Sequence, residues 1–381
     1  MNSPHRLGIA LIGTEFMGRA HSQAWRNVSA FWPQHRVDLK VLVGRQQDKT
    51  AQAATQLGWA ESSTDWAAVI DRDDVDIVDI CTPGNLHADI AIAALNAGKH
   101  VLTEKPLASS LPDAERMTLA AAAARAKGTR SMVGFNYRRV PALAAARDII
   151  QSGRIGKVRH MRVSYLQDWL ADAAAPMSWR LRKEIAGSGV LGDLGSHLVD
   201  QVHFLLGEPI TTVSGHLRTM VPRRPGPGGM EAVTVDDAFW ATAFTDAGVA
   251  ISIEASRMAT GRKSSLEVEI FGETGGIKFD LQRLNELWLL EAAGAAEDRG
   301  YRQILVTERE HPYAAHWWPP GHILGWENTF TNQAADFLQA IGAGEDPRPS
   351  FDDALQVEKT LAAIEASAAA GGLQIPIGDS N

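Results

Sequence analysis

Cysteine is nearly missing from this sequence, because Cys81 is the only one among 381 residues. A single cysteine excludes an intrachain disulfide, and no cluster of cysteine and histidine has the spacing of a structural zinc site. No apolar run reaches the length that crosses a membrane. These absences, together with a short polar beginning in place of a secretory leader, predict a cytoplasmic protein without a bound metal.

Basic charge is also scarce, since the formal net charge is −8. A nucleic-acid or anionic-membrane surface needs a basic face, so neither partner is expected. An anionic cofactor is still compatible with this charge, because helix N-termini and backbone amides bind phosphate locally. The length of 381 residues predicts two domains.

Strand-like apolar runs alternate with helix-like segments along the first 135 residues. This alternation is typical of βαβ units and predicts a Rossmann domain with a parallel sheet over residues 1–135. The expected strands are 7–12, 37–43, 75–81, 100–103 and 131–134, and the expected helices are 17–28, 48–57, 87–97 and 112–126.

The pattern changes after residue 150, where strand candidates such as 158–165 alternate with period two, and residues 136–381 are assigned to a second domain. We expect an α+β domain here, built on a largely antiparallel open sheet that binds substrate and joins subunits, with C-terminal helices that return to the first domain. The expected strands are 158–165, 211–217, 238–245, 249–256, 266–271, 275–280 and 286–290. Helices are expected at 190–206, 326–341 and 354–370, and loops at 222–229 and 291–321.

A glycine turn, Gly13-Thr14-Glu15-Phe16-Met17-Gly18, joins the first strand to the first helix. A dinucleotide pyrophosphate binds at this position in Rossmann domains. Gly13 permits the tight turn and Gly18 permits close packing, but Glu15 replaces the middle glycine of the usual motif. Taken alone, the turn therefore suits an ordinary α/β domain about as well as a cofactor site.

The second strand ends in Leu42-Val43-Gly44-Arg45. An acid at this position would accept hydrogen bonds from the adenosine ribose and favour NAD. Arg45 instead suits adenine stacking or a 2′-phosphate, which leaves NAD and NADP both open. The alternative is that Arg45 is a solvated turn residue.

Later segments resemble the glucose–fructose oxidoreductase/inositol dehydrogenase (Gfo/Idh/MocA) family. The resemblance covers roughly residues 7–280 and is much more specific than the glycine turn. Its motifs are Thr82-Pro83 followed by Asn85 and His87, Ala97-Gly98-Lys99-His100-Val101-Leu102-Thr103-Glu104-Lys105-Pro106, Gly134-Phe135-Asn136-Tyr137-Arg138-Arg139, 150–158 and 189–200.

Three residues of these motifs are candidate catalytic groups. Asp193 and His197 are four residues apart, so both lie on one face of a helix. Lys105 precedes a proline at a strand end, where an ammonium can stabilise charge on an alcohol oxygen. The resemblance implies the same trio, with lysine and histidine sharing proton transfer and aspartate orienting substrate. Each residue alone would more often be structural, and either Lys105 or His197 suits the role of base.

The resemblance also implies the cofactor-binding set. Two of its members have an alternative role, because His87 at a helix start is equally suited to a structural one, and Glu104 either contacts the nicotinamide or orients Lys105. The full set is Gly13, Glu15, Phe16, Met17, Arg45, Thr82, Pro83, Asn85, His87, Glu104, Lys105, Asn136 and Arg138.

The sequence is rich in tryptophan, with eleven of these residues. Flat aromatic faces suit the C–H faces of a sugar ring, although each tryptophan is at least as often a core or interface residue. Trp179 and Arg180, in the loop before the catalytic helix, are the first candidates for substrate contact. The expected substrate site also includes Tyr137, Lys105, Asp193 and His197, with weaker candidates at Trp169, His316, Trp317 and Trp318.

The segment from Glu15 to Ser22, with Phe31-Trp32-Pro33, resembles the branch that contains anhydro-sugar (levoglucosan) dehydrogenases. It implies NAD(P)-dependent oxidation of a secondary ring hydroxyl of a pyranose, anhydro-sugar or inositol to a ketone, with NAD slightly favoured. A ketone or dihydrodiol reductase and a silent dinucleotide-sensing regulator are the alternatives. A homodimer or homotetramer joined through the open sheets is expected.

Overall fold

The computed structural model describes residues 6–293 and 295–378, which form two compact units. The first unit consists of residues 6–139 together with Gly325–Leu355, and the second consists of Val140–Leu324 with residues 356–378. Each unit is described by itself. Among the described helices, none is long and apolar enough to cross a membrane.

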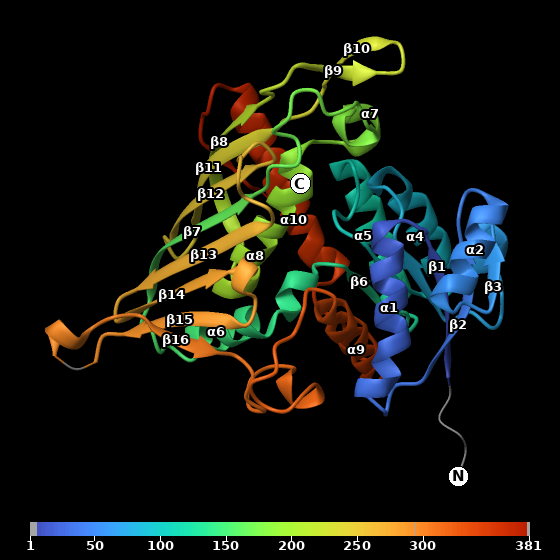
Figure 1. Cartoon of the computed structure of the whole chain (residues 1–381), viewed down its shortest axis with the longest axis horizontal. Helices are drawn as coiled ribbons and strands as arrows, with labels where there is room; N and C mark the ends of the chain where they lie inside the picture. The colour runs from blue at the N-terminus through green and yellow to red at the C-terminus, as the bar shows by residue number, and fades with distance from the viewer. Residues whose placement is uncertain (1–5, 294, 379–381) are drawn as a thin grey trace. The chain divides into compact units, whose positions relative to one another are not determined.

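The first unit is built on a six-stranded parallel sheet in the order β3-β2-β1-β4-β5-β6 (Figure 1). The order reverses between β1 and β4, which is the position where open α/β sheets bind ligands. This sheet confirms the expected Rossmann architecture. Its strands are β1 (Leu7–Ile12), β2 (Val37–Val43), β3 (Glu61–Ser63), β4 (Ile77–Ile80), β5 (His100–Thr103) and β6 (Ser131–Val133).

Helices flank this sheet, and one of them comes from the far end of the sequence. Helix α9 packs against α1, where Ala20 and Ala24 contact Phe330. Apolar side chains on facing helices therefore make residues 325–355 part of the first unit. The helices are α1 (Phe16–Phe31), α2 (Gln47–Leu57), α3 (Trp66–Ile70), α4 (His87–Asn96), α5 (Leu111–Arg125) and α9 (Asn328–Ala343).

The β1–α1 connection is sterically tight at two glycines. A Cβ atom on Gly18 would lie 2.0 Å from the carbonyl oxygen of Gly13, and one on Gly13 would lie 2.5 Å from that of Cys81. Gly13 also has a φ of 126°, a backbone conformation that residues with a Cβ atom rarely adopt. The steric roles expected for both glycines are confirmed.

The second unit contains a nine-stranded sheet in the order β16-β15-β14-β13-β7-β12-β11-β8-β17. Neighbouring strands are antiparallel except β7 and β12, so the expected largely antiparallel sheet is confirmed. The strands are β7 (Val158–Leu166), β8 (Ile210–Arg218), β11 (Ala238–Thr245), β12 (Ala250–Ser256), β13 (Ser265–Gly272), β14 (Gly275–Asp280), β15 (Glu286–Glu291), β16 (Arg302–Leu305) and β17 (Ile375–Pro376).

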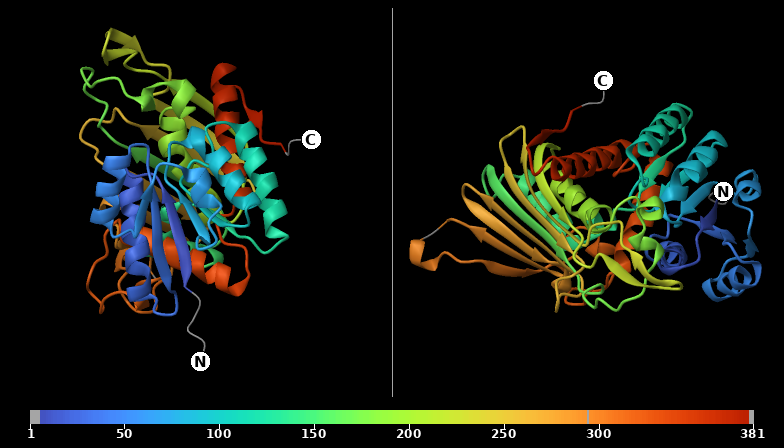
Figure 2. Two further views of the ribbon diagram at one scale, coloured as in Figure 1. Left: turned by 90° about the vertical axis from the view of Figure 1, so that its right-hand side faces the viewer. Right: turned by 90° about the horizontal axis from the view of Figure 1, so that it is seen from above.

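Helices cover one face of this sheet. Helix α8 (Ser196–Leu206) packs on β7, and α6 (Pro141–Gln151) packs on β14 and β15. From the later part of α10 (Phe351–Ala369), Ser367 accepts a hydrogen bond from the N–H of Gly215 on β8. Figure 2 shows no helix of the second unit along the opposite face, within the residues described. Strand residues therefore alternate between a helix-covered and an open face.

Two expected loops and one expected helix are corrected. The loop expected at 222–229 takes part in a hairpin of β9 (Arg223–Gly226) and β10 (Gly229–Ala232), and the loop expected at 291–321 contains β16. Neither segment has a period-two apolar pattern, because β9 is polar and β10 and β16 are largely exposed. The helix expected at 190–206 begins with a π-helical turn, η4 (Leu191–Gly195), before α8.

The close approach at Gly18 generates a stability prediction. Gly18→Ala is expected to lower the free energy of unfolding by about 1–3 kcal/mol, because the added methyl group forces the turn apart. Gly342→Ala in α9 is the matched control. Its added Cβ meets nothing within 4 Å, so helix propensity is expected to raise stability by about 0.5–1 kcal/mol. Urea denaturation measures both, and an unchanged Gly18→Ala midpoint would contradict the steric argument.

Candidate active site

The expected phosphate-binding turn leaves the N-terminus of α1 accessible. Glu15 occupies the N-cap position, but its exposed side chain makes no capping hydrogen bond. The first N–H groups of the helix are therefore not capped by this side chain and suit an anion. Phe16 is also exposed and stacks on Trp326, with ring centroids 5.3 Å apart. Met17 packs against the apolar cluster of Ala20, Ala24 and Phe330.

The carboxyl end of β4 carries a second group of expected cofactor ligands. The hydroxyl oxygen of Thr82 is buried and has no hydrogen-bond partner among the described residues. Pro83 follows it, and Asn85 is exposed. A buried hydroxyl without a partner and an uncapped helix N-terminus fit a dinucleotide with a pyrophosphate group. Arg45, beyond the end of β2, is exposed and has no side-chain partner within the described part of the chain.

His87 and Asn136 are fixed by contacts inside the first unit. The ring nitrogens of His87 lie 2.9 Å from the carbonyl oxygen of Thr82 and 3.0 Å from that of Pro106. Burial lowers the pKa of His87. The amide of Asn136 donates to the hydroxyl of Thr329 on α9 at 2.8 Å. These geometries favour a structural role for both side chains, and their contact with cofactor stays a prediction.

The short helix η2 (Asn136–Arg139) is buried as a whole. Arg139 anchors it to α9 through an ion pair with Asp336 at 3.0 Å. Tyr137 and Arg138, expected to contact substrate and cofactor, are therefore held in a rigid turn. Nothing in this geometry tests the contacts predicted for them.

A buried histidine links the first helix to the strand that precedes Lys105. The Nδ1 atom of His21 lies 2.9 Å from a carboxylate oxygen of Asp79, and its Nε2 atom lies 3.0 Å from Oε1 of Glu104. The indole N–H of Trp25 donates to Asp79 at 2.6 Å. Glu104 in turn accepts the backbone N–H of Lys105 at 3.2 Å. The chain of contacts therefore ends at the expected catalytic lysine.

The electrostatics of this network favour a charged histidine. Burial alone would lower the pKa of His21, but the charge of Asp79 and its hydrogen bond raise that pKa well above its ordinary value. An imidazolium donates from both ring nitrogens, which matches the two carboxylate partners. Burial also raises the pKa of the Cys81 thiol, which therefore stays uncharged.

His21, Asp79 and Cys81 also offer potential metal-ligand atoms within 4.8 Å of one another. Both nitrogens of His21 already face carboxylates, and the thiol is protonated. Hydrogen bonds thus account for the cluster, whereas a metal would need a neutral imidazole and a thiolate.

Asp193 and His197 belong to the second unit. Asp193 lies in the π-helical turn η4, and His197 lies in the first turn of α8. Such turns occur frequently at functional sites. The guanidinium of Arg257 bonds a carboxylate oxygen of Asp193 at 2.7 Å. The ring of Tyr165 meets that of His197 edge-on, with centroids 6.0 Å apart.

The aromatic candidates in the second unit lie at its surface. Trp179 and Arg180 are exposed, and the guanidinium lies 4.4 Å from the indole centroid. Trp169 is also exposed, and the centroid of its indole ring lies 5.2 Å from the guanidinium carbon of Arg257. In the late loop His316 and Trp318 are exposed and Trp317 is half-buried.

Two family models match the chain, one in each unit, and together they cover more than half of it. The model described as an oxidoreductase family with an NAD-binding Rossmann fold covers residues 7–135. The model described as a GFO/IDH/MocA C-terminal domain covers residues 143–278. The chain belongs to the GFO/IDH/MocA oxidoreductase family. It is an NAD-dependent oxidoreductase that acts on CH–OH groups.

Relatives within the GFO/IDH/MocA family match over the full length. Levoglucosan dehydrogenase of Pseudarthrobacter phenanthrenivorans is 40% identical, covering 95% of this chain and 96% of the relative. An oxidoreductase domain protein from Kribbella flavida is 52% identical, with a TM-score of 0.96 over 98% of this chain and 100% of that chain. A solved levoglucosan dehydrogenase complex with NADH and levoglucosan has a TM-score of 0.94 at 40% identity, over 98% and 100%.

Sequence reasoning missed three residues that support the candidate site of this GFO/IDH/MocA member. Asp79 gave a usable signal, because an acid inside an otherwise apolar strand requires a buried partner. His21 and Arg257 gave none, since their partners lie 58 and 64 positions away in the sequence.

The His21 network generates a pH-dependent stability prediction. Because the folded pKa of His21 is raised, its stabilisation is fully present below about pH 6.5, the unfolded value, and is lost as pH rises through the folded pKa. His21→Gln is expected to lower the free energy of unfolding by about 3–5 kcal/mol in acid, and by less in alkali. Urea denaturation from pH 6 to pH 10 measures the difference.

Trp25→Phe is the matched control for His21→Gln. It removes a neutral donor to the same carboxylate, so its cost should change little with pH. A His21→Gln cost that stays constant over the same range would refute the charged histidine.

Proposed function

We propose that the protein oxidises a secondary ring hydroxyl of a pyranose, anhydro-sugar or cyclic polyol to a ketone, with NAD as hydride acceptor. The observation that carries the proposal is the half-buried carboxylate of Asp193, one helical turn before His197, in a chain 40% identical to a levoglucosan dehydrogenase over 95% of its length. Relatives named scyllo-inositol 2-dehydrogenase (NAD(+)) and inositol 2-dehydrogenase support the same substrate class.

The proposed chemistry divides among three side chains. The ammonium of Lys105 donates a hydrogen bond to the substrate oxygen and stabilises the charge that develops there. The hydroxyl proton passes either to His197 while Lys105 stays an ammonium, or to Lys105 in its neutral amine form. Asp193 accepts a hydrogen bond that orients the sugar. When bound, the oxidised nicotinamide supplies the hydride acceptor.

The cofactor is held by residues of the first unit. The N–H groups at the start of α1, after Gly13, bind the pyrophosphate, while Thr82 and Asn85 meet the nicotinamide half. Arg45 would stack on adenine, and the absence of an acidic residue at the end of β2 leaves NADP as a weaker second cofactor. Glu15 points its carboxylate away from the phosphates, consistent with its exposure.

Surface tryptophans of the second unit supply the sugar-binding faces. Trp169 and Trp179 are exposed and each lies against a guanidinium, which fixes the indole plane. A fixed indole stacks on C–H groups at low entropic cost. Arg180 then bonds a ring hydroxyl.

A substrate screen tests the reaction class. Purified protein is incubated with NAD or NADP and with levoglucosan, glucose, other pyranoses, inositols, vicinal diols and ketones, and absorbance at 340 nm is followed. Reduction of NAD by a carbohydrate is expected. Turnover of diols or ketones with none of the carbohydrates would replace the proposal with a reductase of another carbonyl class.

Lys105→Ala tests the proposed mechanism. We expect kcat to fall by at least about 10³-fold, since an electrostatic and proton-transfer group is lost together. NADH binding, followed by fluorescence, should persist. Lys127→Ala removes an exposed lysine of the same unit and should leave kcat unchanged. Unchanged turnover of Lys105→Ala would refute the assigned role.

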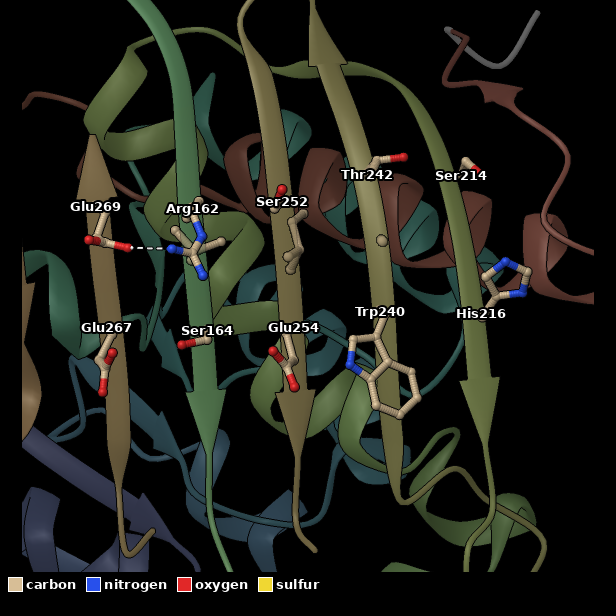
Figure 3. Close-up of a pocket in the computed structure, with 13 residues that line it drawn as sticks. Arg162, Ser164, Ser214, His216, Trp240, Thr242, Ser252, Glu254, Glu267 and Glu269 are labelled. Carbon is tan, nitrogen blue, oxygen red and sulfur yellow. Dashed lines mark hydrogen bonds and ion pairs between the residues drawn. The ribbon is translucent and has the colours of Figure 1, made fainter. Parts of the chain in front are cut away.

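We also propose that the open face of the nine-stranded sheet joins two copies of the chain. This face carries a shallow hollow of about 370 Å³, in which Trp240 and His216 lie on one side of β12 and the Arg162–Glu269 ion pair lies on the other (Figure 3). Trp240 and Phe244 are large apolar side chains exposed on the same strand. Their burial against a second, symmetric sheet would remove apolar area from water.

Trp240→Glu tests this interface. The introduced carboxylate would face its own copy and nearby Glu254, so the oligomer is expected to dissociate to monomers in light scattering after size exclusion. Met230→Glu places the same charge on the exposed hairpin and should leave the mass unchanged. A monomeric wild type would refute the interface outright.

A further inference from the structure

Arg257 lies immediately after β12 and its side chain is almost completely buried. Its backbone is fixed on both sides, because its N–H donates to the carbonyl of Asp237 and its carbonyl accepts from the N–H of Leu170. From this position the Nη2 atom donates to Asp193 at 2.7 Å and to the carbonyl of Gly189 at 3.3 Å. One buried nitrogen thus contacts both the π-helical turn and Gly189, which lies two residues before that turn.

The other donors of Arg257 are not satisfied. Its Nε and Nη1 atoms are buried and have no hydrogen-bond partner among the described residues. A buried guanidinium with unused donors is costly compared with an apolar side chain of similar size. Packing alone would therefore favour a methionine or leucine at this position, so the charge itself requires an explanation.

Arg224 shows what a structural arginine looks like in the same unit. It is fully buried on β9, and its two terminal nitrogens donate at 2.7 Å to the carbonyls of Asp172 and Leu170. Both partners are neutral backbone groups that need donors. Arg257 instead directs its nitrogen at a carboxylate that is about one-third exposed.

The surroundings of Arg257 keep this geometry fixed. Asp236, also buried, accepts the N–H groups of Gly189 and Leu191 at 2.8 and 2.7 Å, which secures the start of the π-helical turn. Burial raises the pKa of Asp236, and the nearby charge of Arg257 opposes that rise. A Cβ atom on Gly189 would lie 1.9 Å from the carbonyl oxygen of Asp236, so the backbones are in direct contact.

We propose that Arg257 is a positioning residue for catalysis, which holds the carboxylate of Asp193 ionised and in one orientation as the hydrogen-bond acceptor for a substrate hydroxyl. The inference rests on the proposed function, because it assumes that Asp193 contacts substrate. A guanidinium bond favours the carboxylate over the carboxylic acid. Asp193 therefore acts as a fixed acceptor, and transfer of the hydroxyl proton falls to the other two groups.

The decisive variant is Arg257→Met, which keeps the volume and removes the charge. Asp193 is exposed enough for water to solvate it, so no buried charge is stranded, and Tm is expected to change by no more than about 2 °C. The kcat should nevertheless fall about 10²-fold, because a misplaced orienting group costs rate. NADH affinity should be unchanged.

Arg257→Lys is the conservative rescue. A lysine can keep one charged hydrogen bond to Asp193 but loses the planar fork, so kcat within about tenfold of wild type is expected. Should Arg257→Met fail to fold, Arg257→Lys and Arg257→Gln provide the comparison, because both keep a hydrogen-bond donor and only the lysine keeps the charge. Equal kcat values for these two would overturn the proposal.

Arg224→Met is the matched control for burial. It leaves the carbonyls of Leu170 and Asp172 without donors, so Tm should fall by about 4 °C or more while kcat stays within about threefold. A purely structural Arg257 would show this same pattern. Loss of stability with retained kcat in Arg257→Met would therefore overturn the proposal.

A double variant separates action through Asp193 from any independent effect. If Arg257 acts only through this carboxylate, Asp193→Asn/Arg257→Met should have the kcat of Asp193→Asn alone. Multiplicative losses would refute the proposal.

Failure of the proposed function is recognised separately, because wild type would then oxidise no carbohydrate. The same variants would be assayed with whichever diol or ketone turns over. A crystal structure of Arg257→Met adds a readout without substrate: the Asp193 carboxylate should leave its wild-type position, and an unmoved carboxylate would count against the proposal.

Discussion

Two buried charges near the candidate catalytic residues, on His21 and Arg257, each have an opposite charge within hydrogen-bond distance, and this pairing constrains the local structure of each unit. In the first unit His21 lies between Asp79 and Glu104. In the second unit Arg257 contacts Asp193. An unpaired ion in either place would cost several kcal/mol, so the local backbone is constrained to keep partners together.

The two pairings have different consequences because their burial differs. The His21 network is closed off from water at all three members, so it contributes mainly to the stability of the Rossmann unit and to the backbone at Lys105. In the Arg257–Asp193 pair the arginine is buried, whereas the Asp193 carboxylate is about one-third exposed to solvent. A partly exposed carboxylate can contact a ligand, and its bond to a buried arginine holds it in one position.

Much of the fold could be predicted from the sequence, because periodic apolar runs report directly on strands and helices. The strands 7–12, 37–43, 100–103, 238–245 and 275–280 have the predicted bounds in the structure. The family was also predictable, since its motifs extend along the chain in order. Strands such as β3 and β9 were missed because they are short and polar, which leaves no periodic signal.

The supporting residues of the site were harder to predict for a different reason. A family motif identifies the residues that are expected to contact a ligand, such as Lys105 and Asp193. It does not identify the residues that hold these side chains in position. His21 and Arg257 act through partners far away in sequence, so only the tertiary structure pairs them. The π-helical turn was missed likewise, because an inserted residue in a helix changes little in the apolar pattern.

The participation of α9 in the dinucleotide unit has a consequence for synthesis of the chain. The apolar face of α1, at Ala20 and Ala24, packs on Phe330, which emerges from the ribosome about three hundred residues later. Until then this face stays uncovered, while residues 140–324, most of the second unit, are made in between. Such long-range closure slows folding and exposes the nascent protein to aggregation, so efficient production of this enzyme should depend on chaperones that shield the first helix.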